Sequence, residues 1–203
     1  MRENGLNSRR RRRWKPRTTD SRHNRPVAPN LLQRDFSAVA PNQKWVGDIM
    51  GIWTKEGWLY LAAILDCFSR RIVGWAMRMF RDASLVEDAL RMALQQRRIT
   101  PEDQLVHHSD RGSQYTAEDY LMLLETYGIA ISMSGKGDPY DNAMMESFFA
   151  TLRAELTELE QFATRAAAQV AVFDYIEVFY NRQRIHTSID YTHPTAYEEC
   201  HHT

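Results

Sequence analysis

An almost uncharged stretch between Lys44 and Lys55 places the strongest constraint on the fold. Its sequence is Trp-Val-Gly-Asp-Ile-Met-Gly-Ile-Trp-Thr, in which Asp48 is the only charged residue. A run of large apolar residues of this length predicts a strand that is buried on both faces. A buried carboxylate is costly unless a cationic side chain, a hydrogen-bond network or a metal ion compensates it. For Asp48 alone, a salt bridge or a strand-end position explains the residue as well as a metal ion does.

The elements after this strand predict the fold class. Two further strands, at 57–65 and 71–77, follow after short links, which favours an antiparallel meander. A helix at 84–97, a strand at 104–109, a helix at 116–127 and a strand at 129–133 come next, and a capping box of Thr116 and Asp119 is expected to open the second helix. Helices are predicted at 139–153, 164–180 and 194–199. This α/β order is that of the ribonuclease-H-like fold, a mixed five-stranded sheet flanked by helices.

The net charge of zero conceals an uneven distribution. Residues 1–26 carry a net charge of +8 and the remaining residues a net charge of −8. A basic segment ahead of an acidic body favours a polyanion such as nucleic acid as partner, although such a run is also typical of a solvated tail or a localisation tag. The arginines expected to contact DNA here are Arg10, Arg11, Arg12 and Arg13.

Proline spacing and periodicity divide the chain into three parts. Residues 1–43 are rich in proline and show no sustained period, so we expect a basic, extended arm. A ribonuclease-H-like core is predicted at 44–160 and a helical extension of it at 161–203. No apolar run approaches the roughly 20 residues of a membrane span, and no secretory signal is evident. Cys67 and Cys200 lie too far apart in sequence to suggest a metal or redox pair, so we expect a reduced, cytoplasmic setting.

The helix predicted at 139–153 has two distinct faces. Asp138 suits the N-cap and Pro139 the first helical position. An apolar stripe recurs at helical spacing and consists of Met145, Phe148, Phe149, Leu152 and Leu156. Glu146 lies on another face with Asn142, Ala150 and Arg153. A single Glu on a helix is usually only solvated, so Glu146 gains interest from the aspartates elsewhere in the chain.

Asp110 is the second aspartate of interest. It ends a predicted strand on which Val106, His108 and Asp110 share one face, and strand ends are where α/β sheets build their sites. The segment from Asp110 to Gly112 fits an ordinary turn equally well.

Taken together, Asp48, Asp110 and Glu146 favour a metal site. Three carboxylates, two on strands and one on a helix, can converge and hold two hard divalent cations, and oxygen ligands suit Mg²⁺ or Mn²⁺. Two such ions promote phosphodiester displacement by activating the attacking oxygen and stabilising the leaving one.

These residues carry a resemblance to a known family. Thirty-five residues separate Asp110 from Glu146, the spacing of the D,D(35)E signature of retroviral integrases and many transposases. The chain most closely resembles the second-frame DDE transposases of the insertion-sequence-three family, through motifs that cover nearly all of it in the family's order. These motifs are Val-Ala-Pro-Asn-Leu-Leu (27–32), Ala-Pro-Asn-Gln-Lys-Trp-Val-Gly-Asp (40–48), Gly-Trp-Leu-Tyr-Leu-Ala (57–62), Leu-Asp-Cys-Phe-Ser-Arg-Arg-Ile-Val-Gly-Trp-Ala-Met (65–77), His-Ser-Asp-Arg-Gly-Ser-Gln-Tyr (108–115), the segment 137–153, and Tyr-Asn-Arg-Gln-Arg-Ile-His (180–186) followed by Pro194.

The resemblance implies a catalytic core that cleaves and joins the DNA ends of a transposable element. It implies that Asp48, Asp110 and Glu146 are the catalytic, metal-binding triad, with two Mg²⁺ or Mn²⁺ ions per site. The DNA-binding residues implied or expected beyond the basic arm are Arg153, Asn142, Lys136, Arg111 and Arg184. The implied partners are the terminal inverted repeats and target DNA, a helix-turn-helix protein from a partner reading frame, and further copies of the chain on DNA. The implied setting is the bacterial cytoplasm at the nucleoid, away from membranes.

Other conspicuous residues are expected to be structural. Asp66 is predicted to lie at a turn, and His107 and His108 to be neutral and hydrogen-bonded. The Cys200-His201-His202 tail with His193 matches no standard zinc spacing, and tryptophans in strands are more often core than base-stacking platforms.

Two departures from the family pattern keep alternatives open. Met50-Gly51 replaces an expected Thr-Tyr, and Asp190 stands where the family usually has glycine. One alternative is an inactive or regulatory DNA-binding fragment of such a transposase. Another is a general ribonuclease-H-like nuclease.

Overall fold

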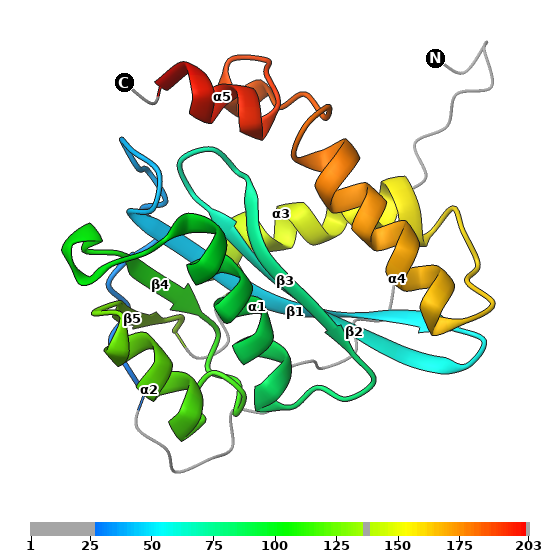
Figure 1. The fold of residues 1–203 in the computed structure, drawn as a ribbon, viewed down its shortest axis with the longest axis horizontal. Coiled ribbons are helices and arrows are strands. Elements are labelled where there is room, and N and C mark those ends of the chain that lie inside the picture. Colours follow the sequence, from blue (N-terminus) through cyan, green and yellow to red (C-terminus); the bar gives the residue numbers. More distant parts are fainter. Residues whose placement is uncertain (1–26, 136–138, 202–203) are drawn as a thin grey trace.

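Five strands form a single mixed sheet in the order β3-β2-β1-β4-β5 (Figure 1). The structure is a computed structural model that describes residues 27–135 and 139–201. The antiparallel meander consists of β1 (Lys44–Thr54), β2 (Gly57–Asp66) and β3 (Ile72–Arg78). The strands β4 (Val106–Ser109) and β5 (Ala130–Met133) extend it in parallel from β1. The predicted α/β, ribonuclease-H-like sheet is therefore confirmed, with its five strands in the predicted places.

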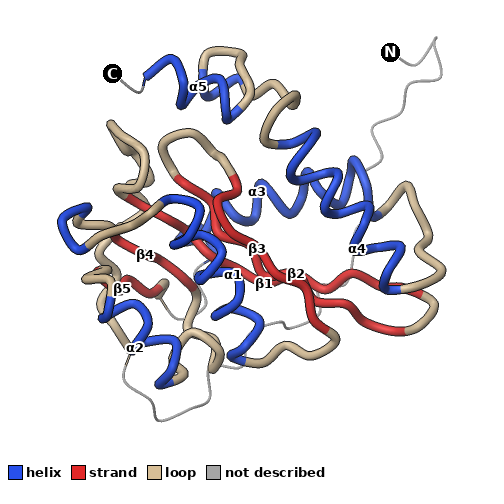
Figure 2. The backbone as a smooth tube through the Cα atoms, in the orientation of Figure 1, coloured by secondary structure: helices blue, strands red, loops and turns tan. Residues whose placement is uncertain are grey.

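Helices cover both faces of the sheet (Figures 1 and 2). One face carries α1 (Ala83–Arg97) and α2 (Glu118–Thr126), and the other carries α3 (Ala143–Leu152) and α4 (Arg165–Phe173). Wider π-helical turns prolong α3 over Arg153–Thr157 and α4 over Asp174–Tyr180. The last helix, α5 (Pro194–His201), lies near the turn that joins β2 to β3. Short 3₁₀ turns are formed by Pro101–Asp103, Pro139–Asn142 and Thr187–Ile189.

Two helix starts differ from their predictions. The Thr116/Asp119 capping box does not form, because α2 begins only at Glu118 and the Thr116 hydroxyl donates instead to the carbonyl of Ser113 at 3.3 Å. The helix predicted from Pro139 begins as a 3₁₀ turn and becomes α-helical at Ala143. The proposed N-cap, Asp138, lies outside the described residues.

The expected burial of the first strand on both faces holds only for part of its length. Trp45 is fully buried, whereas Trp53 is 62% exposed and its cross-strand partner Trp58 is 44% exposed. Figure 1 shows the β1–β2 hairpin, which carries both residues, extending past α1. Gly51 lies beneath the Trp58 ring, since a Cβ at Gly51 would stand 3.0 Å from it. Tryptophan in a strand was thus a poor guide to burial here.

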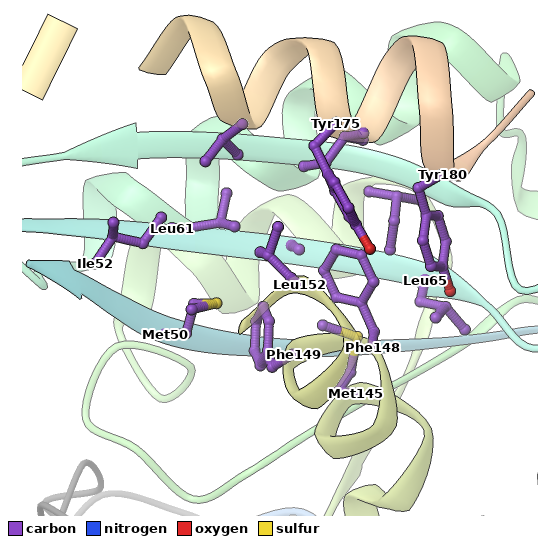
Figure 3. Close-up of a cluster of buried hydrophobic side chains, with 14 of the residues drawn as sticks. Met50, Ile52, Leu61, Leu65, Met145, Phe148, Phe149, Leu152, Tyr175 and Tyr180 are labelled. Carbon is purple, nitrogen blue, oxygen red and sulfur yellow. The ribbon is translucent and has the colours of Figure 1, made fainter. Parts of the chain in front are cut away.

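The helix α3 is held to the sheet by its apolar stripe. Figure 3 shows Phe148, Phe149 and Leu152 between α3 and the strands, with Tyr175 and Tyr180 descending from the segment after α4. Phe148 meets Tyr180 edge-on, with ring centroids 4.8 Å apart. Each large apolar side chain buried in this way contributes about 1.5–3 kcal/mol. The predicted stripe is therefore the contact that fixes how α3 lies on the sheet.

The described part of the N-terminal arm lies against the core. Leu32 is buried in the cluster beneath α3. The backbone N–H of Asn42 donates to the Asp66 carboxylate at 2.8 Å, and the Lys44 ammonium pairs with Asp35 at 3.0 Å. Residues 27–43 thus form a packed lead-in to β1.

The C-terminal helix is attached by a buried ionic network. The carboxylate of Glu198 accepts hydrogen bonds from the Ser69 hydroxyl at 2.7 Å, from Arg71 at 2.8 Å and from Arg97 at 2.9 Å. These contacts bind α5 to the β2–β3 turn and to α1. Just before α5, Asp190 takes a left-handed backbone with φ of 55°, which explains why glycine would suit this position.

Shortening a buried residue of the α3 stripe tests this packing. Leu152 is completely buried, so Leu152→Ala should lower the free energy of unfolding by about 2–5 kcal/mol. Leu159→Ala is the matched control, because Leu159 is 76% exposed and should change stability by less than about 0.5 kcal/mol. Urea denaturation of both variants measures the difference. Equal effects would show that the stripe does not hold α3.

Candidate active site

Asp48 lies on the face of β1 that α3 covers. Val46 and Met50, two residues to either side, belong to the cluster beneath α3, so strand alternation places the Asp48 side chain on the same face. The residue is half-buried, and its Oδ1 accepts the backbone N–H of Ile49 at 2.7 Å.

Asp110 directly follows the end of β4, the strand that runs parallel to β1. The last pair of these strands is Val46 with His108, two residues before Asp48 and Asp110 respectively. The charge of Asp110 acts on the Asp48 carboxylate, which places the two residues near each other. The Asp110 Oδ1 accepts the backbone N–H of Gly112 at 2.8 Å, and a Cβ at Gly112 would lie only 2.9 Å from that oxygen. A side chain at position 112 would therefore displace the Asp110 carboxylate from this turn.

Glu146 projects from the first turn of α3 and is exposed. The start of this helix is tied to β1 by Asn142, whose amide donates to the carbonyl of Gly47 at 3.3 Å. Gly47 immediately precedes Asp48, so the same contact brings the helix start next to the strand carboxylate.

The charges of Asp110 and Glu146 both act on Asp48. The pKa of Asp48 is raised to about 7, chiefly by burial and then by the negative charges of Asp110 and Glu146, while the hydrogen bond from Ile49 and the charge of Arg153 lower it. The pKa of the buried Tyr115 hydroxyl is also raised, chiefly by burial and then by the charges of Asp48 and Asp110. The side chains predicted to form one site therefore lie within reach of each other's field.

This donor set fits hard divalent cations. Carboxylate oxygens are the ligands that Mg²⁺ and Mn²⁺ prefer, and a cation would relieve the repulsion that raises the Asp48 pKa. Across residues 27–135 and 139–201, however, no three acidic, histidine or cysteine side chains already stand close enough to hold an ion. Holding one would require movement of a side chain. Glu146 is suited to this because it is exposed and its long side chain has several rotamers.

The residues predicted to bind DNA occupy different environments. Arg153 is exposed and near enough to lower the pKa of Asp48. Arg111 donates to the Ser134 carbonyl at 2.6 Å, and Arg184 forms an ion pair with Glu155 at 2.8 Å. Asn142 is buried with its amide bonded to Gly47. Lys136 and the arginines at 10, 11, 12 and 13 lie outside the described residues.

The conspicuous histidines and the buried Asp66 belong to the fold. His107 bonds the Tyr120 hydroxyl at 2.5 Å, and His108 lies between the hydroxyls of Ser132 and Ser134. Burial lowers the pKa of both rings, which keeps them neutral as predicted. The Asp66 carboxylate accepts the N–H groups of Asn42, Trp45 and Phe68. None of these groups is needed to explain the candidate site.

One residue with a place at the site was not singled out from the sequence. Asp141 is buried beside Asn142 and accepts hydrogen bonds from two separate segments of the chain, although the sequence indicated only its position near the helix start. Acidic residues are common at helix starts, so no signal in the sequence distinguished Asp141.

Comparisons with known proteins agree with this geometry. The pattern of the integrase core domain family matches residues 38–139, and a second pattern of the same description matches residues 127–194. The transposase InsF of insertion sequence IS3A from Escherichia coli K12 is 44% identical over 198 residues, which are 98% of this chain and 68% of that protein. A 31 kDa protein of insertion element IS600 from Shigella sonnei is 49% identical over 91% of this chain and 67% of its own length. The chain thus spans about two thirds of these relatives.

Solved structures of similar fold include viral integrases. A chain of the simian T-cell lymphotropic virus intasome superimposes with a TM-score of 0.63 at 16% identity, over 92% of this chain and 62% of that one. The catalytic core of the HTLV-2 integrase, solved with magnesium, gives a TM-score of 0.58 at 14% identity, over 80% of this chain and 99% of that one. At such identities the likeness shows a shared fold.

The raised pKa of Asp48 gives a pH-dependent prediction. In metal-free protein, carboxyl ¹³C NMR should show Asp48 titrating near pH 7, and Asp110→Asn should lower that midpoint by removing a neighbouring charge. Because the folded-state pKa lies above the unfolded one, the stability that Asp48 contributes is full below about pH 4 and is lost as the pH rises through 7. A normal Asp48 midpoint, unmoved by Asp110→Asn, would mean that the carboxylates do not interact.

Proposed function

The chain belongs to the integrase-core family, among the DDE transposases of IS3-type insertion sequences, and on that premise we propose that it cleaves and joins DNA at the ends of a transposable element. Transposases of this family are polynucleotidyl transferases. In the proposed reaction, water first displaces a 3′-oxygen from the phosphodiester at the element's end. The freed 3′-hydroxyl then attacks a phosphodiester of target DNA and releases a second 3′-hydroxyl. Each step makes one P–O bond and breaks one.

The observation that carries this proposal is the grouping of Asp48, Asp110 and Glu146. Asp48 lies on β1, Asp110 follows the parallel strand β4, and Glu146 lies on the helix that covers β1. Burial and then the charges of Asp110 and Glu146 raise the Asp48 pKa. In the proposal these three side chains hold two Mg²⁺ or Mn²⁺ ions. When bound, such ions supply an activated attacking oxygen and stabilise the leaving one.

The remaining residues are assigned roles around these carboxylates. Arg153 is proposed to neutralise a DNA phosphate beside the triad, since it is exposed and lies in the field of Asp48. Asn142 is proposed to position α3 through its hydrogen bond to the carbonyl of Gly47. The buried Tyr115 is proposed to line the site next to Asp48 and Asp110. Lys136, Arg111 and Arg184, together with the arginines at 10, 11, 12 and 13, are proposed to contact DNA backbone, where Arg184 would have to exchange its ion pair with Glu155.

The proposed partners follow from the reaction. The chain is proposed to bind the terminal inverted repeats and target DNA as more than one copy, together with a helix-turn-helix protein from a partner reading frame. Proteins of similar fold include an integrase chain within a viral intasome. No described helix has the length and apolar character required to cross a bilayer. The activity is proposed to take place on the DNA of the nucleoid.

Removal of single carboxylates tests the proposed chemistry. Asp110→Asn and Glu146→Gln should each reduce Mg²⁺- or Mn²⁺-dependent cleavage and joining of labelled element ends by at least about 100-fold, because each removes a proposed ligand without changing side-chain size. Asp119→Asn is the control, since Asp119 is exposed on α2. Activity that survives either substitution would refute the assignment.

The two alternatives predict different outcomes with other DNA. A general nuclease would cleave DNA that lacks terminal repeats as fast as element ends, whereas the proposed transposase should cleave it at least about tenfold more slowly, as specific contacts imply. A DNA-binding fragment without activity would show salt-sensitive binding and no metal-dependent cleavage, even with the partner protein present. Gel assays of binding and of cleavage, carried out with both DNAs, distinguish the proposed transposase from the general nuclease and from the inactive DNA-binding fragment.

A further inference from the structure

Asp141 is a buried carboxylate that accepts hydrogen bonds from three residues in two separate segments of the chain. It is 5% exposed and lies two residues before the first residue of α3. Its Oδ2 accepts the side-chain amide of Asn30 at 3.1 Å and the backbone N–H of Gly135 at 2.7 Å. Its Oδ1 accepts Nε–H of Arg34 at 3.3 Å. A buried charge needs such compensation, and most of it comes from residues more than 100 positions earlier in the chain.

The two earlier donors belong to a segment that we call the strap, residues 29–34. The strap is fastened to β5 by the N–H of Leu31, which donates to the Ser132 hydroxyl at 2.9 Å. The carbonyl of Pro29 accepts the N–H of Met133 at 3.2 Å. Leu32 is buried in the cluster beneath α3. The strap therefore joins the last strand of the sheet to the start of α3.

The backbone of the strap is strained where it turns towards Asp141. Gln33 and Arg34 have φ angles of 49° and 68°, a left-handed conformation that costs free energy for residues other than glycine. The Gln33 N–H donates to the Asn30 side-chain oxygen at 2.9 Å and closes this turn. Consecutive strained residues persist where surrounding contacts hold them, and here those contacts converge on Asp141.

The start of α3 lacks its own side-chain cap. No side chain accepts a hydrogen bond at the N-cap position, Asn142, and the preceding turn is a 3₁₀ helix of four residues. The hold on this helix start therefore comes from tertiary contacts, through Asp141 and through the bond from Asn142 to Gly47. Glu146 stands only one helical turn further on. A shift of Asp141 would be passed to Glu146 through this short segment.

We propose that Asp141 is a positioning residue, and that the strap residues Asn30 and Arg34 hold it so that Glu146 faces Asp48 and Asp110. The role of Glu146 as a metal ligand rests on the proposed function. The contacts by which the strap and Asp141 stabilise the start of α3 do not depend on it. The strap is then part of the catalytic unit: a change in residues 29–34 alters the site without touching a carboxylate of the triad.

Hydrogen exchange and metal binding on the purified chain test this proposal. Arg34→Ala and Asp141→Asn should speed exchange of the amides of residues 143–147 about tenfold in metal-free protein, the change expected when a charge-assisted hydrogen bond that limits local opening is lost. Amides of α1 should be unaffected. Both variants should also bind Mn²⁺ more weakly, as measured by electron paramagnetic resonance of free Mn²⁺.

Arg78→Ala is the matched control. The Arg78 side chain is 45% exposed and pairs with Asp88, while that of Arg34 is 56% exposed and pairs with Asp141. Arg78→Ala should change neither exchange at 143–147 nor Mn²⁺ binding.

Three results would overturn the proposal. Unchanged exchange at 143–147 in both variants would show that the strap does not hold α3. Faster exchange throughout α1 as well would show general destabilisation. Faster exchange confined to 143–147 with unchanged Mn²⁺ binding would show that the held segment does not position Glu146. If Asp48→Asn itself binds Mn²⁺ normally, the proposed metal site is wrong, and the exchange data alone decide whether the strap holds the helix.

Discussion

Burial of the Asp48 carboxylate near two further acidic residues is the constraint around which the rest of the structure is arranged. Asp48 lies on β1, Asp110 follows the end of the parallel strand β4, and Glu146 lies on the covering helix. Burial is the largest cause of the raised pKa of Asp48 in the metal-free protein, and the charges of Asp110 and Glu146 add to it. A fold tolerates such a concentration of like charge only when packing elsewhere prevents the elements from moving apart.

That packing is supplied on both sides of the site. Beneath α3, the residues Phe148, Phe149 and Leu152 bury a continuous apolar face against β1 and β2. On the opposite face of the sheet, which α1 and α2 cover, His107 and Tyr120 form a buried hydrogen bond. On α5, the carboxylate of Glu198 accepts hydrogen bonds from Ser69, Arg71 and Arg97. The C-terminal helix therefore stabilises the turn between β2 and β3, on which the meander depends. The unfavourable site is therefore held by contacts that take no part in it.

The sequence predicted the sheet, because apolar runs with short links define the meander by local rules. The three carboxylates were assigned through the family resemblance, since local patterns explained Asp48, Asp110 and Glu146 one by one without a metal ion. Their assignment to one metal site stays a prediction. Contacts between distant segments could not be predicted from local rules. Nothing near Asn30 in the sequence indicates a partner at Asp141, and the exposure of Trp53 depends on where α1 ends in space. The capping box at Thr116 failed for a related reason, since the loop after Asp110 uses that hydroxyl to close its own turn.

Anomalous diffraction from crystals soaked in Mn²⁺ tests the central claim most directly, namely that Asp48, Asp110 and Glu146 form one metal site. The expected result is two Mn²⁺ peaks about 3.5–4 Å apart, held by Asp48, Asp110 and Glu146, with the Glu146 side chain rotated towards them. Peaks elsewhere, or a Glu146 that remains in solvent while the aspartates bind no metal, would contradict it.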